Sequence, residues 1–127
     1  MDFKIRSGIR HQLDEEVTSE KTARHFGSGQ VDVYATPAMI ALMEKTALES
    51  VGSLLPEGYT TVGTEVNVKH LKATAPAKQV RAESYLRKVE GIRLFFELHA
   101  WDERGMIGIG THTRVIVNEN EFMEKLK

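Results

Sequence analysis

The sequence predicts an α+β fold in which a curved antiparallel sheet surrounds a single long helix. One amphipathic segment, residues 36–51, has helical spacing, and the four segments that follow it have the period of strands. Tight turns link three of these strands, and strands joined in this way pair antiparallel. A helix with one apolar face must bury that face, so we expect it to pack on the sheet.

The first part of the chain carries weaker signals. Residues 4–17 mix apolar and polar types and are expected to begin with a strand. Residues 18–30 are polar and irregular, and Phe26-Gly27-Ser28-Gly29 within them is typical of a flexible loop. Val31 and Val33 indicate a short extended piece before the helix.

The predicted helix has a start signal and a stop signal. Thr36 can cap the first turn, and Pro37 suits the first helical position, where a missing backbone N–H leaves no hydrogen bond unmade. Gly52 can end the helix, because glycine readily adopts the conformation that commonly follows a last turn.

The strand-like segments alternate apolar and polar residues. They span residues 60–74, 78–89, 92–101 and 106–117. Turns at 90–91 and 102–105 join the last three segments as hairpins. Residues 118–127 form a polar tail with room for a short terminal helix. Such a sheet leaves edges and one face open, so we expect a homodimer.

Composition excludes several classes of protein. A chain of 127 residues suits one domain with a real core, and we assign residues 1–127 to a single domain. A net charge of -1 gives no reason to expect nucleic acid or a membrane as partner. The chain has no cysteine, which excludes disulfides and thiolate nucleophiles. With neither a run of ~20 apolar residues nor a signal-peptide core, we expect a cytoplasmic protein.

The most informative residue is Glu44. Its neighbours three and four positions away on the helix surface are all apolar: Ile40, Ala41, Ala47 and Leu48. Glu44 therefore projects from the face that should be buried. An ionised carboxylate there is unfavourable unless it is paired, and such groups concentrate at functional sites. The alternative, an ordinary exposed glutamate, is opposed by these neighbours.

Thr36 and His70 are the other candidates for chemistry. The helix N-terminus at Thr36 can stabilise a developing oxyanion, although Thr-Pro at a helix start is more often only a cap. His70 shares a strand face with Val66 and Val68 and can act as a general base or acid. The alternative for His70 is a core histidine whose hydrogen bonds are all satisfied.

The spacing of these residues limits how they can cooperate. Eight helical residues rise roughly 12 Å, so Thr36 and Glu44 of one chain cannot bond directly. An imidazole between them could complete a Thr–His–Glu relay. Alternatively, the helix N-terminus of one subunit faces Glu44 of its dimer partner. The sequence leaves both arrangements open.

Two other kinds of site have less support. No His-Glu-x-x-His or similar ligand spacing occurs, so we expect no metal. A basic stretch near one turn could hold the phosphates of a nucleotide-like ligand, or could be a solvated strand face. This stretch consists of Lys69, Lys72, Lys78 and Arg81.

Two segments carry a family resemblance. Residues 34–44, Tyr-Ala-Thr-Pro-Ala-Met-Ile-Ala-Leu-Met-Glu, and residues 62–71, Val-Gly-Thr-Glu-Val-Asn-Val-Lys-His-Leu, resemble the hot-dog-fold thioesterases, most of all the fluoroacetyl-CoA thioesterase group. The resemblance covers about Val31 to Val117. It implies a hot-dog fold, hydrolysis of acyl-CoA at a homodimer interface, and no cofactor beyond the coenzyme A of the substrate. It does not imply fluoroacetate.

The resemblance also implies roles for individual residues. The threonine, the glutamate eight positions later and the strand histidine of that group match Thr36, Glu44 and His70, which are therefore the expected catalytic set. We assign substrate binding to Phe26, Tyr34, Lys69 and Arg114. The two aromatic residues would form a lid or a wall of the acyl pocket. Arg114 belongs to the late-strand motif of such proteins.

Three functional hypotheses follow. The first is a thioesterase for small or medium acyl-CoA, with either Thr36 or Glu44 as the nucleophile. The second is another hot-dog protein, either an acyl-CoA-binding regulator without turnover or a dehydratase. The third is a structural dimerisation domain. The sequence leaves open the acyl group and whether coenzyme A or an acyl-carrier protein carries it.

Overall fold

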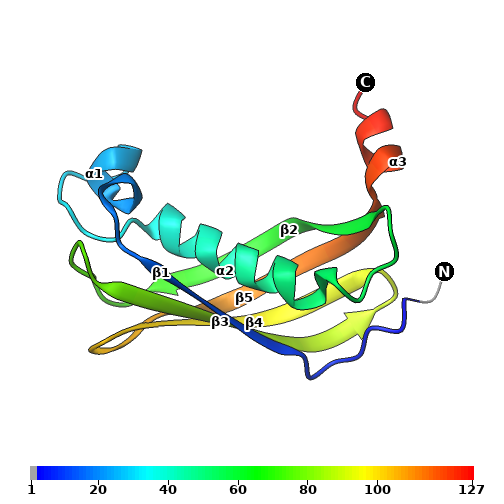
Figure 1. Ribbon diagram of the computed structural model, residues 1–127, viewed down its shortest axis with the longest axis horizontal. Helices are drawn as coiled ribbons and strands as arrows, with labels where there is room; N and C mark the ends of the chain where they lie inside the picture. Colours follow the sequence, from blue (N-terminus) through cyan, green and yellow to red (C-terminus); the bar gives the residue numbers. More distant parts are fainter. Residues whose placement is uncertain (1–2) are drawn as a thin grey trace.

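The computed structural model describes residues 3–127, and it confirms the predicted α+β architecture. Five strands form one antiparallel sheet, and one long helix runs along it (Figure 1). The elements are β1 (Arg10–Glu16), η1 (Ser19–Lys21), α1 (Ala23–Phe26), α2 (Thr36–Gly52), β2 (Tyr59–His70), β3 (Gln79–Glu90), β4 (Arg93–Asp102), β5 (Gly105–Asn118) and α3 (Glu119–Glu124).

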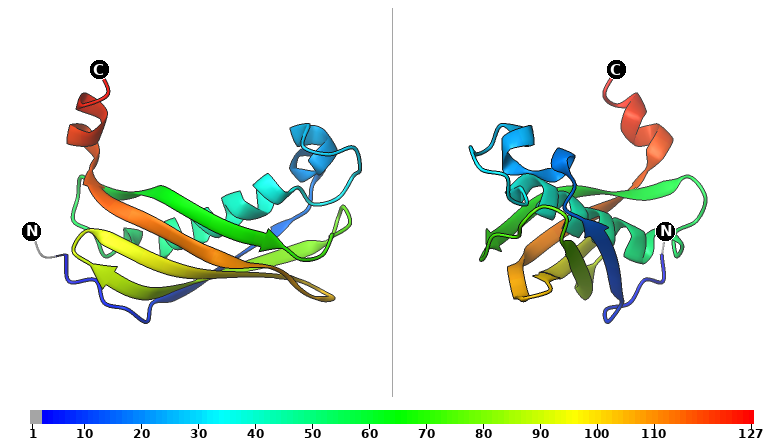
Figure 2. Two further views of the ribbon diagram at one scale, coloured as in Figure 1. Left: turned by 180° about the vertical axis from the view of Figure 1, so that it is seen from behind. Right: turned by 60° about the vertical axis from the view of Figure 1, so that its left-hand side comes forward.

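The sheet has the order β1-β3-β4-β5-β2. The strands β3, β4 and β5 are joined by the two predicted turns, and β2 lies beside β5 rather than beside β3. Strands β1 and β2 are therefore the two edges. Figure 2 shows that α2 occupies one face of this curved sheet, while α3, the predicted terminal helix, stands away from it.

The core lies between α2 and the sheet face beneath it. The predicted alternation in β4 is confirmed, because Leu94, Phe96, Leu98 and Ala100 are all buried. From the helix, Met39, Met43 and Ala47 meet that face and are completely buried. No helix within residues 3–127 is long and apolar enough to span a membrane.

Two glycines of β5 let neighbouring elements approach closely. A Cβ at Gly110 would lie 2.2 Å from the carbonyl oxygen of Asn67 on β2. A Cβ at Gly108 would lie 2.6 Å from Sδ of Met39 on α2. Side chains at either position would therefore separate β5 from β2 or from the helix.

The interpretation of residues 18–30 as irregular is wrong. This segment contains η1 and the four-residue helix α1. Thr22 caps α1 by accepting a hydrogen bond from the backbone N–H of His25, and Gly27 ends it with a left-handed φ of 75°. A single turn is too short to show helical periodicity, which explains why the pattern did not reveal it.

The predicted cap of α2 is also wrong. Ala35 is the N-cap, Thr36 is the first helical residue, and no side chain caps the helix among the described residues. The hydroxyl of Thr36 is instead used in a contact with β2. The helix ends at Gly52, one residue beyond the prediction, and β2 ends at His70 rather than near Thr74.

Strand β2 has an unusual exposure pattern. Residues 63–67 are all exposed, whereas a strand with one buried face alternates. The pairing with β5 shifts between Gly63 and Glu65, which marks a bulge. The free edge of β2 is therefore exposed over these residues.

Candidate active site

A cavity opens where the start of α2 meets the end of β2. Its volume is about 350 Å³. Its lining comes from α1 and the loop after it, from the start of α2 and from the chain after β2: Ala23, Ser28, Val33, Tyr34, Thr36, Pro37, His70, Leu71, Lys72 and Ala73. The structure thus brings two of the three expected catalytic residues, Thr36 and His70, into one cavity.

These two residues are directly bonded. The Thr36 hydroxyl and Nδ1 of His70 share a hydrogen bond of 2.7 Å. The other ring nitrogen, Nε2, is buried and has no close hydrogen-bond partner among residues 3–127. Burial lowers the pKa of His70, opposed by a hydrogen bond with the backbone of Lys72. The ring is therefore neutral near pH 7, and the expectation of a fully satisfied core histidine is wrong.

The start of α2 adds a site for negative charge beside Thr36. Because no side chain caps the helix among the described residues, N–H groups of its first turn remain available. The positive end of the helix dipole lies at the same point. An acyl oxygen placed here would have its developing charge stabilised.

Tyr34 lies in the wall of the cavity. Its ring meets the imidazole of His70 edge-on, with centroids 6.4 Å apart. Its hydroxyl donates a hydrogen bond of 2.6 Å to Oε2 of Glu15, and burial, together with this carboxylate, raises the pKa of the phenol. Tyr34 therefore packs against the histidine and presents only its ring to the cavity.

The other residues assigned to substrate binding lie elsewhere in the chain. Phe26 is 48% exposed and lines a separate hollow with Ala38 and Leu42, so the structure does not bring it to Thr36. Lys69 is exposed on β2. Arg114 is buried in the middle of the sheet, beneath Glu44.

The predicted basic stretch does not form one patch. Arg81 forms an ion pair with Asp14 on the opposite edge strand. Lys72 lies at the cavity, but its ammonium group points to the carbonyl oxygen of Arg104, 3.4 Å away. The structure therefore gathers no cluster of these cations for a phosphate group.

Glu44 lies in a second cluster, two turns along α2 from Thr36. Its side chain is half-buried and reaches over Gly63 of β2. A Cβ at Gly63 would lie 3.1 Å from Oε2 of Glu44, 3.1 Å from Cε1 of His112 and 3.3 Å from Nη1 of Arg114. The absence of a side chain at Gly63 thus leaves a small space faced by a carboxylate, an imidazole and a guanidinium group.

Hydrogen bonds fix the guanidinium group of Arg114 in this cluster. Its Nε donates to Oγ1 of Thr61 at 2.7 Å, and its Nη2 donates to the carbonyl oxygen of Thr61 at 2.9 Å. Its Nη1 lies 3.1 Å from Nε2 of His112. Burial lowers the pKa of Arg114, and the charge of Glu44 opposes this shift.

The same contacts determine the protonation of His112. Its Nδ1 lies 2.7 Å from the carbonyl oxygen of Glu65, which can only accept, so Nδ1 carries a proton. Its Nε2 faces a guanidinium donor, so that nitrogen accepts. Burial lowers the pKa of His112 below its ordinary value, the charge of Arg114 adds to this shift, and the hydrogen bond to Glu65 and the charge of Glu44 oppose it. His112 is thus neutral, with one tautomer.

The sequence did not reveal this cluster as a unit. It indicates Glu44 and Arg114 separately and gives no role to Gly63, Thr61 or His112. The signal was present in the alternation of His112, Arg114 and Ile116, all buried on one face of β5. Reading it required the pairing of β5 with β2, which sequence periodicity does not specify.

The relay within one chain does not form. Nε2 of His70 has no partner, and the carboxylate of Glu44 makes no hydrogen bond to another residue of the described chain. The chain therefore holds these residues in two separate groups, Thr36 with His70 and Glu44 with Arg114, which we name the two half-sites. Within residues 3–127, no group of three or more His, Asp or Glu is placed to hold a metal ion.

Comparison with known proteins identifies the family of the chain. The family model described as fluoroacetyl-CoA-specific thioesterase matches residues 17–120. The chain is 33% identical over 129 residues to the fluoroacetyl-CoA thioesterase of Streptantibioticus cattleyicolor, covering 97% of this chain and 93% of that protein.

Solved structures give the same result. A mutant of the fluoroacetyl-CoA-specific thioesterase in complex with fluoroacetate and CoA is 34% identical, with a TM-score of 0.87 over 93% of this chain and 99% of that one. A hot-dog-like protein from Thermanaerovibrio acidaminovorans, 24% identical, superposes with a TM-score of 0.90 over 99% and 95% of the two chains. Because the Thermanaerovibrio protein is only 24% identical, its similarity supports the hot-dog fold and nothing further.

Proposed function

The chain belongs to the fluoroacetyl-CoA-specific thioesterase family, and from this membership and the geometry of the two half-sites we propose that it hydrolyses acyl-CoA thioesters in a site shared by two copies of the chain. The products are a carboxylate and free coenzyme A. Support for an acyl-CoA substrate comes from the relative that binds fluoroacetate and CoA.

The observation that carries the shared site is the unpartnered Nε2 of His70. A buried nitrogen without a hydrogen bond is unfavourable, so a partner is expected from outside the chain. Glu44 offers a carboxylate without a hydrogen bond, and a carboxylate is the group that most often orients a catalytic imidazole. Each half-site thus lacks what the other one has.

The open edge of β2 allows two copies of the chain to bring their half-sites together. Two copies of β2 can pair antiparallel about a two-fold axis. If the axis passes between Val66 and Asn67, Gly63 of one strand faces His70 of the other. Glu44 lies over Gly63, so Glu44 of the partner subunit then lies beside His70. The exposed residues 63–67 become buried in this dimer.

The shared site can perform the reaction by either of two routes. In the first, Thr36 gives its proton to His70 and its oxygen attacks the thioester carbon. The carbon–sulfur bond breaks, the proton passes to the thiolate, and water later releases the acyl group from Thr36. In the second, Glu44 of the partner subunit takes a proton from a water molecule whose oxygen attacks the thioester carbon, the carbon–sulfur bond breaks, and the proton passes to the thiolate. If Glu44 attacks directly, it forms an anhydride as the thiolate leaves, and water hydrolyses that anhydride. The first turn of α2 stabilises the oxyanion in both routes.

These residues supply a nucleophile, a proton carrier and an oxyanion site, so the proposal includes no metal and no cofactor besides the coenzyme A of the substrate. The cavity of about 350 Å³ suits a small or medium acyl group with the adjoining end of the thiol carrier. A cytoplasmic location is part of this proposal, because acyl-CoA is a cytoplasmic substrate.

The test combines a substrate panel with subunit mixing. Thiol release is measured with acetyl- to long-chain and aromatic acyl-CoA, and the His70→Ala and Glu44→Gln variants are expected to be inactive separately. After subunit exchange, each mixed dimer contains one intact site, so a 1:1 mixture regains about a quarter of the wild-type activity. No recovery, with mixed dimers demonstrated by mass spectrometry, contradicts the shared site.

The same experiment tests the function itself. No thiol release from any acyl-CoA by the wild-type protein, with saturable binding of the same ligands, would support an acyl-CoA-binding regulator instead. Trapping an acyl group on Thr36 in a quenched reaction would select the first route. Full activity of Thr36→Val would exclude that route.

A further inference from the structure

The outer wall of the cavity is a loop, and the middle of this loop makes few contacts with the rest of the protein. The loop joins α1 to α2, and Ser28 and Val33 in it line the cavity together with Ala23. Val31 is 58% exposed, so the centre of the loop contributes little to the core. A wall of this kind keeps its position only if polar contacts hold it.

Backbone hydrogen bonds close the two ends of this loop. The N–H of Ala23 donates to the carbonyl oxygen of Val33 at 2.9 Å, and the N–H of Ala35 donates to that of Lys21 at 2.9 Å. Near the start of the loop, the N–H of Ser28 donates to the carbonyl oxygen of Ala23 at 3.1 Å. None of these bonds reaches residues 29–32.

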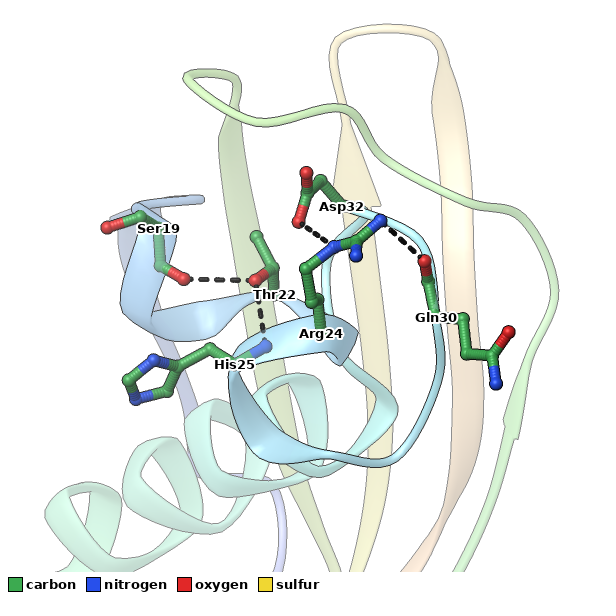
Figure 3. A network of polar contacts seen from close by, with 6 residues as sticks. All are labelled: Ser19, Thr22, Arg24, His25, Gln30 and Asp32. Atoms are coloured by element: carbon green, nitrogen blue, oxygen red, sulfur yellow. Dashed lines mark hydrogen bonds and ion pairs between the residues drawn. The ribbon is translucent and has the colours of Figure 1, made fainter.

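One side chain holds the middle of the loop. Nη2 of Arg24 donates to the carbonyl oxygen of Gln30 at 2.7 Å, and Nε of Arg24 donates to Oδ1 of Asp32 at 3.1 Å (Figure 3). Within the described residues, these are the only side-chain hydrogen bonds made to residues 29–32.

The helix that carries Arg24 is itself fixed. Oγ1 of Thr22 accepts from the backbone N–H of His25 at 3.3 Å and donates to the carbonyl oxygen of Ser19 at 3.0 Å (Figure 3). Thr22 is 4% exposed, so this anchor is buried. The backbone that carries Arg24 is therefore held in place. From it, the guanidinium group bridges Gln30 and Asp32 in the middle of the loop.

We propose that Arg24 is a positioning residue for acyl-CoA hydrolysis, which holds residues 27–33 as a fixed wall of the cavity that contains Thr36 and His70. This inference rests on the proposed function for its effect on turnover. The planar guanidinium group reaches two acceptors at once, which a lysine ammonium group on a flexible stem does not reproduce. The loop is thereby ordered before the acyl-CoA arrives, which favours binding.

The test compares Arg24→Met with a matched arginine. Arg10 also forms an exposed ion pair, with Glu83 on the outer face of the sheet, and the two arginine side chains are 62% and 64% exposed. Arg10→Met therefore removes a similar contact away from the cavity. We expect Arg24→Met to raise KM for acyl-CoA about tenfold with little change in kcat, and Arg10→Met to change neither.

Two further variants examine the contact itself. Asp32→Asn removes the negative charge of one acceptor and leaves the carbonyl oxygen of Gln30 in place. Its effect should therefore be smaller than that of Arg24→Met and should not add to it in the double variant. Arg24→Lys should recover only part of the loss. A general structural role would not move KM alone, because partial unfolding lowers the active fraction and hence kcat.

A second measurement does not depend on activity. Amide hydrogen exchange of residues 27–33 should accelerate in Arg24→Met and remain unchanged in Arg10→Met. Unchanged exchange in Arg24→Met would overturn the proposal whether or not the protein is a thioesterase. Faster exchange with an unaltered KM would show that the loop is held but does not serve the cavity, and would also overturn it. An inactive wild-type protein would refute only the proposed function.

Discussion

Two histidines on neighbouring strands differ in what their ring nitrogens contact. His112 on β5 is buried and His70 on β2 is half-buried, and burial lowers the pKa of each. Both nitrogens of His112 are bonded, to the carbonyl oxygen of Glu65 and to Arg114. Within residues 3–127, Thr36 is the one side chain hydrogen-bonded to His70, and Nε2 of the ring is buried without a close hydrogen-bond partner.

The difference shows that burial does not identify a catalytic histidine, whereas the groups bonded to its ring nitrogens do. The nitrogens of His112 face a carbonyl oxygen, which has no proton, and a guanidinium group, which does not give one up. Nδ1 of His70 instead faces the hydroxyl of Thr36 and can take its proton. His112 is thus a structural group that orients Arg114, and His70 is available for chemistry.

The largest difference should appear in activity. His70→Ala is expected to lower kcat/KM by about 10²–10⁴-fold, because it removes the group that accepts and returns the proton. Its melting temperature should stay close to that of the wild type, since the ring is only half-buried and shares a single side-chain hydrogen bond within the described chain. Thiol release and a thermal melt measure the two effects. Activity within a few-fold of wild type would remove His70 from the mechanism.

The next effect should appear in stability. His112→Ala leaves Nη1 of Arg114 without its acceptor and opens a cavity under α2, so the free energy of unfolding should fall by about 2–4 kcal/mol. Urea denaturation measures this loss. A smaller loss than that of His70→Ala would reverse the comparison between the two histidines.

The pH dependence should sharpen the comparison in the acid range. The folded-state pKa of each histidine lies below its ordinary value of 6.5, so the folded chain favours the neutral rings. Their contribution to stability is complete above pH 6.5 and is lost as the pH falls towards the folded pKa values. The kcat/KM should fall over the same range as His70 gains a proton. Melting curves and pH–rate profiles of wild type and His112→Phe would separate the two residues, because only stability should become less pH-dependent in that variant.

The smallest effect concerns another unsatisfied group. Oγ of Ser84 is buried in β3 with no hydrogen-bond partner in the described part of the chain, and Ser84 does not line the cavity. Ser84→Ala is therefore expected to raise the free energy of unfolding by at most about 1 kcal/mol, with no change in kcat/KM. A clear destabilisation, measured by urea denaturation, would mean that the hydroxyl has a partner such as an ordered water molecule.

The sequence predicted the fold well where a long pattern carried the information. The alternation in β4 and the Thr-Pro start of α2 located these elements to within a residue or two. It missed α1, because one helical turn has no period. It also gave Thr36 the role of cap, since local sequence does not show that His70 competes for its hydroxyl.

For the site, the sequence identified single residues better than their groupings. The apolar neighbours of Glu44 indicated an unusual carboxylate, and the structure finds it half-buried above Gly63. Its companions His112 and Arg114 come from a strand 68 to 70 residues further along, and only the pairing of β5 with β2 brings them there. Likewise, periodicity within one chain contains no information about a partner subunit.

The two glycines of β5 have a consequence for reading mutational data. Neither Gly108 nor Gly110 touches the cavity that contains Thr36, yet a methyl group at either would collide with Met39 or with the backbone at Asn67. In a saturation library scored only for survival of function, both positions would resemble active-site positions, although they report the spacing between layers. A screen that counts soluble protein separately from turnover would distinguish such spacer positions from the residues that handle the substrate.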